Sequence, residues 1–169
     1  MKTSAIYFIT LSCFLLSCKG KSQQPMSKEQ DQSAKGPISD VAHRTDEEWK
    51  KILSPEQFYV LREKGTESPF TGKYLNQNDK GVYTCAACGY ELFNSDMKCD
   101  SHCGWPSFDK EIEGGRIKKQ VDKSAGMVRT EILCGRCGGH IGHLFDDGPT
   151  ETGMRYCVNS VSLGFKKEK

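Results

Sequence analysis

The sequence has little net charge, no long apolar run and no internal repeat beyond two short cysteine pairs. Its 169 residues carry a formal charge of only +2, with basic and acidic residues interspersed, which argues against nucleic acid as a partner. The main apolar stretch, residues 5–16, is shorter than the roughly 20 residues that span a bilayer. Apolar residues make up 36% of the chain, which suits one soluble domain with a modest core.

The first residues have the form of an export signal. Lys2 precedes the apolar stretch, which closes on Leu15-Leu16-Ser17-Cys18 and resembles the lipobox of bacterial lipoproteins. We therefore expect residues 1–17 to be a lipoprotein signal peptide and Cys18 to be the lipid anchor. The mature protein would lie in the bacterial cell envelope, on the periplasmic or surface side, and would be held to the membrane by lipid alone. An ordinary secretory signal, or lipid attachment at Cys13, is the alternative.

Residues 18–44 are predicted to be a flexible tether, because most of them are Lys, Ser, Gln, Gly and Asp with almost nothing apolar. The folded domain is predicted to span residues 45–167. It opens with two capping boxes, Thr45-x-x-Glu48 and Ser54-Pro55-x-Gln57, which predict two short helices. The apolar residues of these helices are Trp49, Ile52 and Leu53 in the first and Phe58, Val60 and Leu61 in the second, which should end at Gly65.

The rest of the domain predicts short strands separated by glycine and Asp/Asn turns, at residues 81–85, 90–94, 116–121, 127–133, 140–145 and 154–165. Strands of this length without intervening helices favour an antiparallel sheet domain with the helices wrapped around it. In the last segment, alternation places Arg155, Cys157 and Asn159 on one face. The apolar pattern changes face after Asn159, which predicts a bulge or turn near Ser160.

Two C-x-x-C pairs, Cys85/Cys88 and Cys134/Cys137, are each followed by glycine, as in zinc knuckles. Four thiolates complete a tetrahedral shell and leave no open position for a catalytic water. We therefore predict one structural Zn²⁺ per chain. Disulfides are the alternative in an exported protein, although paired short spacings fit knuckles better.

Three further cysteines of the folded domain are Cys99, Cys103 and Cys157. The guanidinium of Arg155 would favour a thiolate at Cys157, which makes Cys157 the candidate nucleophile. The alternative is that Cys157 is a small apolar residue packed in a strand. Cys103 precedes Gly104-Trp105-Pro106-Ser107-Phe108, an aromatic loop that forms either a rigid wall near a redox-capable sulfur or a pair of core anchors.

Two histidines stand at i and i+3 in His140-Ile141-Gly142-His143. A regular strand would point them to opposite faces, but a kink at Gly142 could bring both to one pocket. The residues themselves leave open whether either histidine is catalytic.

Five motifs occur in order over residues 45–165: Glu63-Lys64-Gly65-Thr66-Glu67-Ser68-Pro69-Phe70, the paired C-x-x-C, Cys103-Gly104-Trp105-Pro106-Ser107-Phe108, the segment from His140 to Pro149, and Arg155-Tyr156-Cys157-Val158-Asn159-Ser160. Together they resemble the B-type peptide-methionine (R)-sulfoxide reductases. The resemblance implies a mainly β fold of two antiparallel sheets with zinc at one end. It also implies repair of methionine-R-sulfoxide in proteins, with recycling by a thioredoxin-like dithiol reductant. We expect a monomer.

The resemblance further implies residue roles. Cys157 would be the nucleophile and would become a sulfenic acid, which Cys103 would resolve as a disulfide. Trp105, with Phe108, would bind the substrate, and the polar site residues would be His140, His143, Asp147, Arg155 and Asn159. Cys85, Cys88, Cys134 and Cys137 would be the zinc ligands. Cys99 and His102 depart from the family pattern, and Cys99 is either a packing residue or a second redox partner for Cys103. Competing functions are a non-catalytic zinc-dependent binding module and a thiol–disulfide oxidoreductase.

Overall fold

The computed structural model describes residues 41–169. The predicted signal peptide at residues 1–17, the predicted anchor Cys18 with its alternative Cys13, and residues 18–40 of the predicted tether lie outside the described residues. Over the part that is described, no helix is both long and apolar enough to cross a membrane.

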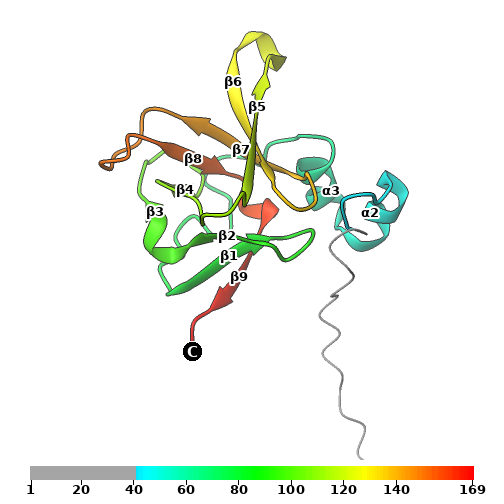
Figure 1. The fold of residues 1–169 in the computed structure, drawn as a ribbon, viewed down its shortest axis with the longest axis horizontal. Coiled ribbons are helices and arrows are strands. Elements are labelled where there is room, and N and C mark those ends of the chain that lie inside the picture. The colour runs from blue at the N-terminus through cyan, green and yellow to red at the C-terminus, as the bar shows by residue number, and fades with distance from the viewer. Residues whose placement is uncertain (1–40) are drawn as a thin grey trace, which may run out of the picture. The chain divides into compact units, whose positions relative to one another are not determined.

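Two antiparallel sheets form the body of the domain (Figure 1). The smaller sheet has the strand order β2 (Glu91–Asn94), β1 (Gly81–Cys85) and β9 (Leu163–Lys167). The larger sheet has the order β3 (Lys98–Cys99), β4 (Ser107–Phe108), β8 (Arg155–Val158), β7 (His140–Phe145), β6 (Arg129–Cys134) and β5 (Ile117–Asp122). The predicted mainly β fold with two antiparallel sheets is therefore confirmed.

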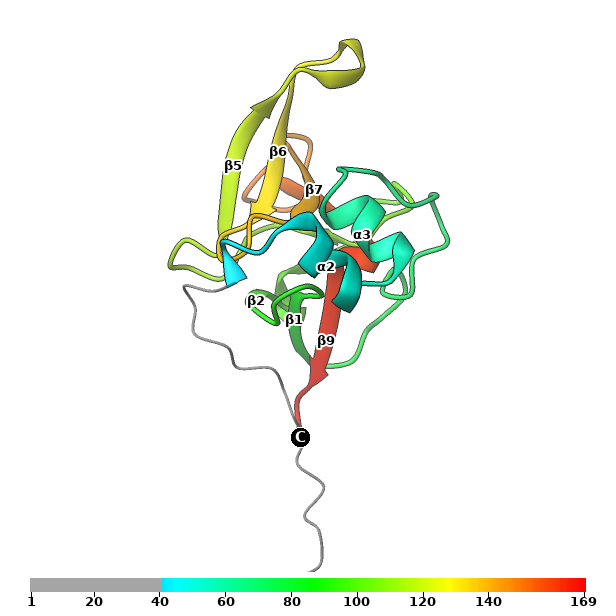
Figure 2. The same cartoon turned by 90° about the vertical axis from the view of Figure 1, so that its right-hand side faces the viewer.

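Two short helices precede the strands, as the capping boxes predicted. In α2 (Asp46–Ile52) and α3 (Pro55–Leu61), the side chain of the residue before the helix accepts a backbone hydrogen bond, and the side chain of Glu48 or Gln57 accepts one from the backbone N–H of that residue. Figure 2 shows α2 beside α3, and α3 packs against β7 and the short 3₁₀ turn η3 (Ser160–Ser162). The helices thus cover the side of the domain where the chain passes from one sheet to the other.

The second helix ends at Leu61 rather than at the predicted Gly65. The chain leaves the helix because Lys64 adopts a positive φ of 60°, and the N–H of Gly65 then donates to the carbonyl of Tyr59. The ring of Tyr59 lies over Gly65, and a Cβ there would lie 2.2 Å from it, so a larger residue would displace this exposed ring.

The packed domain begins earlier than predicted. Val41 is 8% exposed and belongs to the hydrophobic core, and the guanidinium of Arg44 lies 5.2 Å from the ring centre of Trp49. The predicted tether, residues 18–44, therefore extends too far. The physical reason is that Val41 is an apolar side chain close to a capped helix, and burying it against the core of that helix is favourable.

The predicted strand at residues 154–165 is two strands. β8 lies in the larger sheet and β9 in the smaller, and η3 joins them, so the turn predicted near Ser160 is where the chain changes sheets. The strands β3 and β4 were not predicted, because they have two residues each and are too short to show an alternating pattern. The other strands agree with prediction, with β1 and β7 at the predicted bounds.

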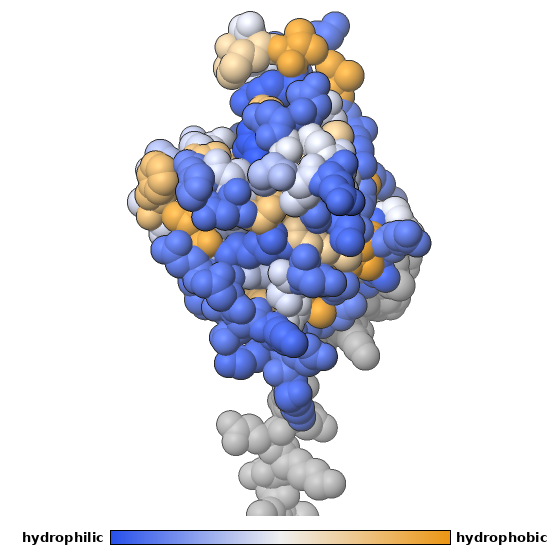
Figure 3. All heavy atoms as spheres, turned by 90° about the vertical axis from the view of Figure 1, so that its left-hand side faces the viewer, coloured by the Kyte–Doolittle hydropathy of each residue, from blue (hydrophilic) through white to orange (hydrophobic). Residues whose placement is uncertain are grey.

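The strands β5 and β6 form a hairpin that projects from the body (Figures 1 and 2). Met127 and Val128, near its turn, are exposed, and apolar surface gathers at the top of Figure 3, over this hairpin. Closer to the body, β6 pairs with β7 and so lies beside the candidate site.

Candidate active site and metal centre

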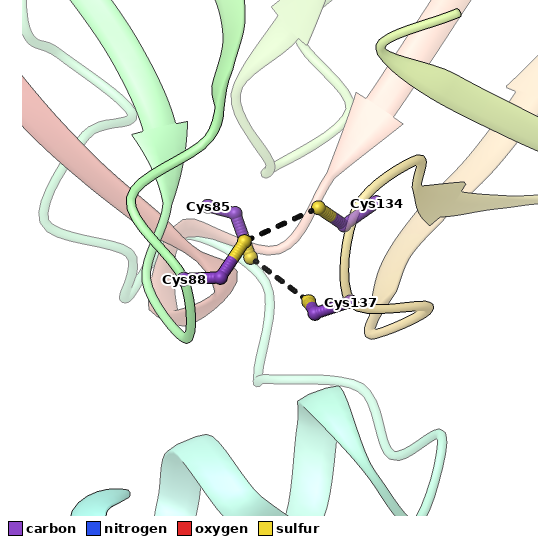
Figure 4. A group of neighbouring side chains, drawn as sticks. All are labelled: Cys85, Cys88, Cys134 and Cys137. Carbon is purple, nitrogen blue, oxygen red and sulfur yellow. Dashed lines mark hydrogen bonds between the residues drawn. The ribbon is translucent and has the colours of Figure 1, made fainter. Parts of the chain in front are cut away.

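Four cysteine sulfurs meet between the two sheets (Figure 4). Cys85 ends β1 of the smaller sheet and Cys134 ends β6 of the larger, and each C-x-x-C pair closes a tight turn. In both turns the second cysteine is followed by a glycine with φ of +69°, Gly89 and Gly138, whose N–H donates back to the carbonyl of the first cysteine. The predicted glycine-assisted knuckles are present, and they face each other across the sheets.

The geometry of this cluster fits a tetrahedral metal. The four sulfur atoms all lie within 4.8 Å of one another, with Cys85 and Cys137 at 3.7 Å and Cys88 and Cys134 at 3.6 Å. A zinc ion bound at about 2.3 Å by four sulfurs sets neighbouring sulfurs roughly 3.8 Å apart, which matches this spacing. The cluster therefore fits a structural zinc site that would tie the two sheets together.

One row of residues crosses all six strands of the larger sheet, and we call it the cross-strand row. The register pairs Gln120 with Glu131, Glu131 with His143, His143 with Cys157, Cys157 with Ser107, and Ser107 with Cys99. Directly paired residues point to the same face of a sheet, with Cβ atoms about 4.5–5.5 Å apart. The row sets a chemically active side chain on nearly every strand of one face.

Cys103 lies against the middle of this row. Its Sγ is 3.8 Å from the Sγ of Cys157, 3.4 Å from the Oγ of Ser107 and 3.1 Å from the Oγ of Ser101. A disulfide needs a sulfur–sulfur distance of about 2.05 Å, so a shift of about 2 Å would join Cys103 and Cys157. The structure brings together the two cysteines that the resemblance paired.

The two thiols differ in acidity. Burial raises the pKa of the Cys157 thiol to about 12, the neighbouring Cys103 adds to the shift, and the charge of Arg155 opposes it. For Cys103, burial also acts to raise the pKa, but hydrogen bonds from Ser101 and Ser107 outweigh burial and lower it. The first thiolate of the pair therefore forms on Cys103. Arg155 acts on Cys157 in the predicted direction but is not strong enough alone to make it a thiolate in this resting arrangement.

Arg155 is held by Asp147. Its Nε and a terminal nitrogen donate to the two carboxylate oxygens of Asp147 at 2.7 and 2.9 Å, and its guanidinium lies 4.4 Å from the ring centre of Phe145. These hydrogen bonds raise the pKa of Arg155 and lower that of Asp147. Asp147 therefore fixes the position of the cation near Cys157.

Cys157 opens to a cavity of about 120 Å³. Its walls are both apolar and polar, and the lining residues are Thr66, Trp105, Arg129, Gly142, His143, Phe145, Cys157, Val158 and Asn159. Of the residues predicted for the site, Cys157, Trp105, His143 and Asn159 line this cavity. Thr66 and Phe145 lie within two of the family motifs but were not assigned to the site, and Arg129 was missed because nothing in its local sequence marks it as a neighbour of Cys157.

The two histidines occupy different places. His143 lines the cavity, and its Nε2 lies 2.9 Å from Asp122. His140 is 2% exposed and does not line the cavity, but its ring centre is 5.4 Å from that of His143. The two rings therefore lie next to each other, as the predicted kink at Gly142 allowed. The pairing of β6 with β7 shifts register beside this glycine, between Ile132 and Leu133. His140 is thus a buried neighbour of His143 and does not line the cavity.

His140 belongs to a buried hydrogen-bond network around Glu131. Its Nδ1 is 2.7 Å from Glu131, which also accepts from Lys64 and Gln120. Burial alone would raise the pKa of Glu131, but these hydrogen bonds lower it, so the group is a carboxylate and His140 Nδ1 carries the proton. Burial lowers the pKa of His140 itself, which keeps the ring neutral with its Nε2 unprotonated. Glu131 was missed because its partners come together only through the pairing of β5, β6 and β7 and through Lys64, which is 67 residues away in the chain.

Gly142 allows β7 and β8 to approach closely at Cys157. A Cβ at Gly142 would lie 2.0 Å from the carbonyl oxygen of Cys157, so any side chain would push the strands apart. Gly142 thus allows the close approach of the strands at Cys157 as well as the kink between the two histidines.

Glu67 connects several parts of the site and was not recognised from the sequence. Its buried carboxylate accepts from the N–H of Ser160 at 2.6 Å and of Val161 at 2.9 Å. Its own N–H donates to Asn159, and its carbonyl accepts from the indole of Trp105 at 3.1 Å. Glu67 therefore holds the turn between the sheets and both flanking site residues. A carboxylate inside a Gly/Ser/Pro-rich loop was the available signal.

Phe108 is not a substrate-binding residue in this structure, which corrects the prediction. Its side chain is fully buried, stacks on Phe93 at 4.2 Å and contacts Tyr83 at 5.0 Å between ring centres. It lies on β4 next to Ser107, and alternation turns it to the opposite face from the cysteines. Phe108 is a core anchor, whereas Trp105 borders the cavity.

The fold and site together define a small β domain with a four-cysteine cluster that fits a metal and a close pair of cysteines beside a cavity. Comparison with known proteins identifies the family. The SelR domain model matches residues 53–167. The chain is 58% identical over 126 residues to the peptide methionine sulfoxide reductase MsrB of Leptospira interrogans, covering 75% of this chain and 96% of that protein. It is 57% identical over 129 residues to that of Methanosarcina barkeri, covering 76% and 91%. The chain belongs to the B-type methionine sulfoxide reductases.

Proposed function

We propose that this protein reduces methionine-R-sulfoxide in proteins through Cys157, with Cys103 as the resolving cysteine, and so repairs oxidised proteins. Methionine sulfoxide reduction itself follows from the family. The observation that supports the finer mechanism is the distance of 3.8 Å between the Cys103 and Cys157 sulfurs, at a cavity that Cys157 lines.

The cavity suits a sulfoxide-bearing side chain. Trp105 and Phe145 offer apolar surface for the methyl group and methylenes, while His143 offers a polar group for the sulfoxide oxygen. A sulfoxide sulfur carries three different substituents and is chiral. A cavity with an apolar wall on one side and polar groups on another therefore binds one epimer better than the other.

The first chemical step uses the Cys157 sulfur as nucleophile. As it attacks the sulfoxide sulfur, the sulfoxide oxygen must gain a proton, which the Cys157 thiol or a water held by His143 supplies. The sulfur–oxygen bond of the substrate breaks and the oxygen ends on Cys157. The thioether of methionine leaves, and Cys157 becomes a sulfenic acid. The substrate gains two electrons and the cysteine loses two.

Cys103 completes the cycle. Its lowered pKa favours the thiolate, which attacks the sulfenic sulfur of Cys157 and releases water as the disulfide forms. A thioredoxin-like dithiol protein then reduces this disulfide by thiol–disulfide exchange. Ser101 and Ser107, whose hydroxyls stabilise Cys103, support this role.

Zn²⁺ is the metal we propose for the four-cysteine cluster, bound by Cys85, Cys88, Cys134 and Cys137. It would act structurally, by tying β1 of one sheet to β6 of the other. The sulfurs are all committed to the cluster, so the metal takes no part in the reaction at Cys157.

We also propose that the protein is exported and lipid-anchored in the bacterial cell envelope. The support is the apolar segment that ends at Leu15-Leu16-Ser17-Cys18. Changing Cys18→Ala should move the protein from the membrane fraction to the soluble fraction without changing the activity of the purified enzyme. Unchanged membrane retention would point to Cys13 or to an uncleaved segment.

The function is tested by supplying the R and S epimers of peptide methionine sulfoxide separately, with a dithiol reductant. The R epimer should be converted to methionine and the S epimer should not. Conversion of neither would favour a zinc-dependent binding module, and reduction of protein disulfides without either sulfoxide would favour a thiol–disulfide oxidoreductase.

A further inference from the structure

Cys99 is the cysteine of the described chain that neither the metal cluster nor the proposed reaction uses. It lies at the end of the cross-strand row, where β3 pairs with β4 and β4 with β8. Ser107 stands between Cys99 and Cys157 in this row, so all three side chains point to the same face of the sheet.

Cys103 contacts Cys157 and Ser107, the residue that stands between the two outer cysteines in the sheet. Its Sγ is 3.8 Å from Cys157 and 3.4 Å from the hydroxyl of Ser107, the direct neighbour of Cys99 in the sheet. Paired Cβ atoms are about 4.5–5.5 Å apart, which leaves Cys99 one side chain beyond Ser107. Burial raises the pKa of the Cys99 thiol, and charges on Asp109 and Cys103 raise it further, as expected of close neighbours.

The two outer cysteines open to different cavities. Cys157 lines the cavity of about 120 Å³ that the proposed reaction uses. Cys99 lines a second, more polar cavity of about 420 Å³, together with Ser101 and Ser107, and Trp105 borders both cavities. A disulfide between Cys103 and Cys157 therefore faces the substrate cavity, whereas one between Cys103 and Cys99 would face the larger opening.

We propose that Cys99 is a third redox cysteine, which takes the disulfide from Cys157 and presents it to the reductant at the larger cavity. This step rests on the proposed function. The sulfur of Cys99 loses its proton and attacks the Cys103 sulfur of the Cys103–Cys157 disulfide. The Cys99–Cys103 bond forms, the Cys103–Cys157 bond breaks, and Cys157 leaves as a thiolate that takes up a proton. The exchange involves no net oxidation.

The loop between β3 and β4 has to move for this exchange, because a disulfide requires Cα atoms about 5–6 Å apart. Cys103 lies in this loop of residues 100–106, between His102 with φ of 50° and Gly104 with φ of 92°. The outcome of the exchange is a free Cys157 at the substrate cavity while the oxidised pair waits for an external dithiol.

The number of methionines released per chain tests this proposal. The reduced, zinc-loaded enzyme is given excess methionine-R-sulfoxide without any reductant, and released methionine is counted. The wild type should release two per chain, since transfer of the disulfide to Cys99 frees Cys157 for a second attack that leaves a sulfenic acid. Cys99→Ser should release one, because its Cys103–Cys157 disulfide blocks the nucleophile. Cys103→Ser should also release one and keep the sulfenic acid on Cys157.

The outcomes distinguish a failure of the disulfide transfer from a failure of the proposed function. One methionine per chain from both the wild type and Cys99→Ser would overturn the transfer and leave the proposed function standing. No methionine from the wild type would overturn the proposed function itself. Peptide mapping of wild-type enzyme after one equivalent of sulfoxide adds an independent readout, and it should show a Cys99–Cys103 disulfide. Cys99→Ala should behave as Cys99→Ser does, and a Cys103–Cys157 disulfide alone in the wild type would contradict the proposal.

Discussion

Substitution of Glu67 by alanine should weaken the domain at the point where the two sheets join. The carboxylate accepts from the backbone N–H groups of Ser160 and Val161, at 2.6 and 2.9 Å, in the turn that leads from β8 to β9. The backbone of Glu67 holds Asn159 and Trp105. The side chain of Glu67 therefore stabilises the turn, and its backbone connects the turn to Asn159 and Trp105, which line the cavity.

The magnitude follows from the hydrogen bonds that are lost. In Glu67→Ala the two backbone N–H groups lose their acceptor, and each unsatisfied buried group costs about 1–3 kcal/mol. Ser160 is buried but Val161 only partly, so we expect a loss of about 3 kcal/mol in the free energy of unfolding. A domain of this size is stabilised by about 5–15 kcal/mol, so the variant should still fold. Loosening of the turn that begins next to Asn159 should shift this residue at the cavity and lower kcat/KM by about tenfold.

Urea unfolding of the zinc-loaded protein measures this loss. Glu63→Ala is the matched control, since Glu63 is exposed and its carboxylate has no hydrogen bond or ion pair among residues 41–169. The control should stay within about 0.5 kcal/mol of wild type. Glu67→Gln keeps one acceptor oxygen, so its free energy of unfolding should lie between those of Glu67→Ala and Glu63→Ala. A Glu67→Ala variant as stable as the control would refute the account of this turn.

Three other changes test separate parts of the structure. Removal of the metal with a strong chelator should unfold the domain, as loss of far-UV circular dichroism would show, and a metal-free, folded and active protein would contradict a structural role. Cys103→Ser should lower the pKa of Cys157, because the neighbouring sulfur raises it, so alkylation of Cys157 at pH 8 should become faster than in wild type; a slower rate would show that the sign is wrong. Phe108→Ala should lower the free energy of unfolding by about 3–5 kcal/mol, while Trp105→Ala should mainly raise KM. If instead Phe108→Ala mainly raised KM and Trp105→Ala mainly lowered stability, Phe108 would be a substrate-binding residue after all.

Local signals predicted local structure well. The capping boxes at Thr45 and Ser54 mark helix starts because the bonds that satisfy the first N–H groups come from residues three positions apart. The C-x-x-C pairs predicted the clustering of the four cysteines for a similar reason, since each knuckle is a short turn with its own glycine. The family resemblance then supplied the two-sheet arrangement.

Long-range contacts could not be predicted in this way. The pairing of Ser107 with Cys157, and of Cys99 with Ser107, depends on strands of two residues that carry no periodic signal. Glu67 meets the turn at Ser160 across more than half of the folded chain. The sequence also could not separate Phe108 from Trp105, because both are aromatic residues of one loop, and only the strand register turns Phe108 inward.

The pKa of Cys157 also could not be predicted from the neighbouring residues in the chain. The neighbouring Arg155 suggested a thiolate, and its charge does act in that direction. Burial and the sulfur of Cys103 act more strongly in the other direction, and neither is visible from the residues next to Cys157 in the chain.

The most direct test of Cys157 as the nucleophile is to find where the substrate oxygen goes. Cys103→Ser is treated with one equivalent of methionine-R-sulfoxide, and sulfenic acids are trapped with dimedone and located by mass spectrometry. The adduct should be on Cys157, in proportion to the methionine released. Methionine release with the adduct on Cys99, or with no cysteine adduct at all, would contradict the mechanism.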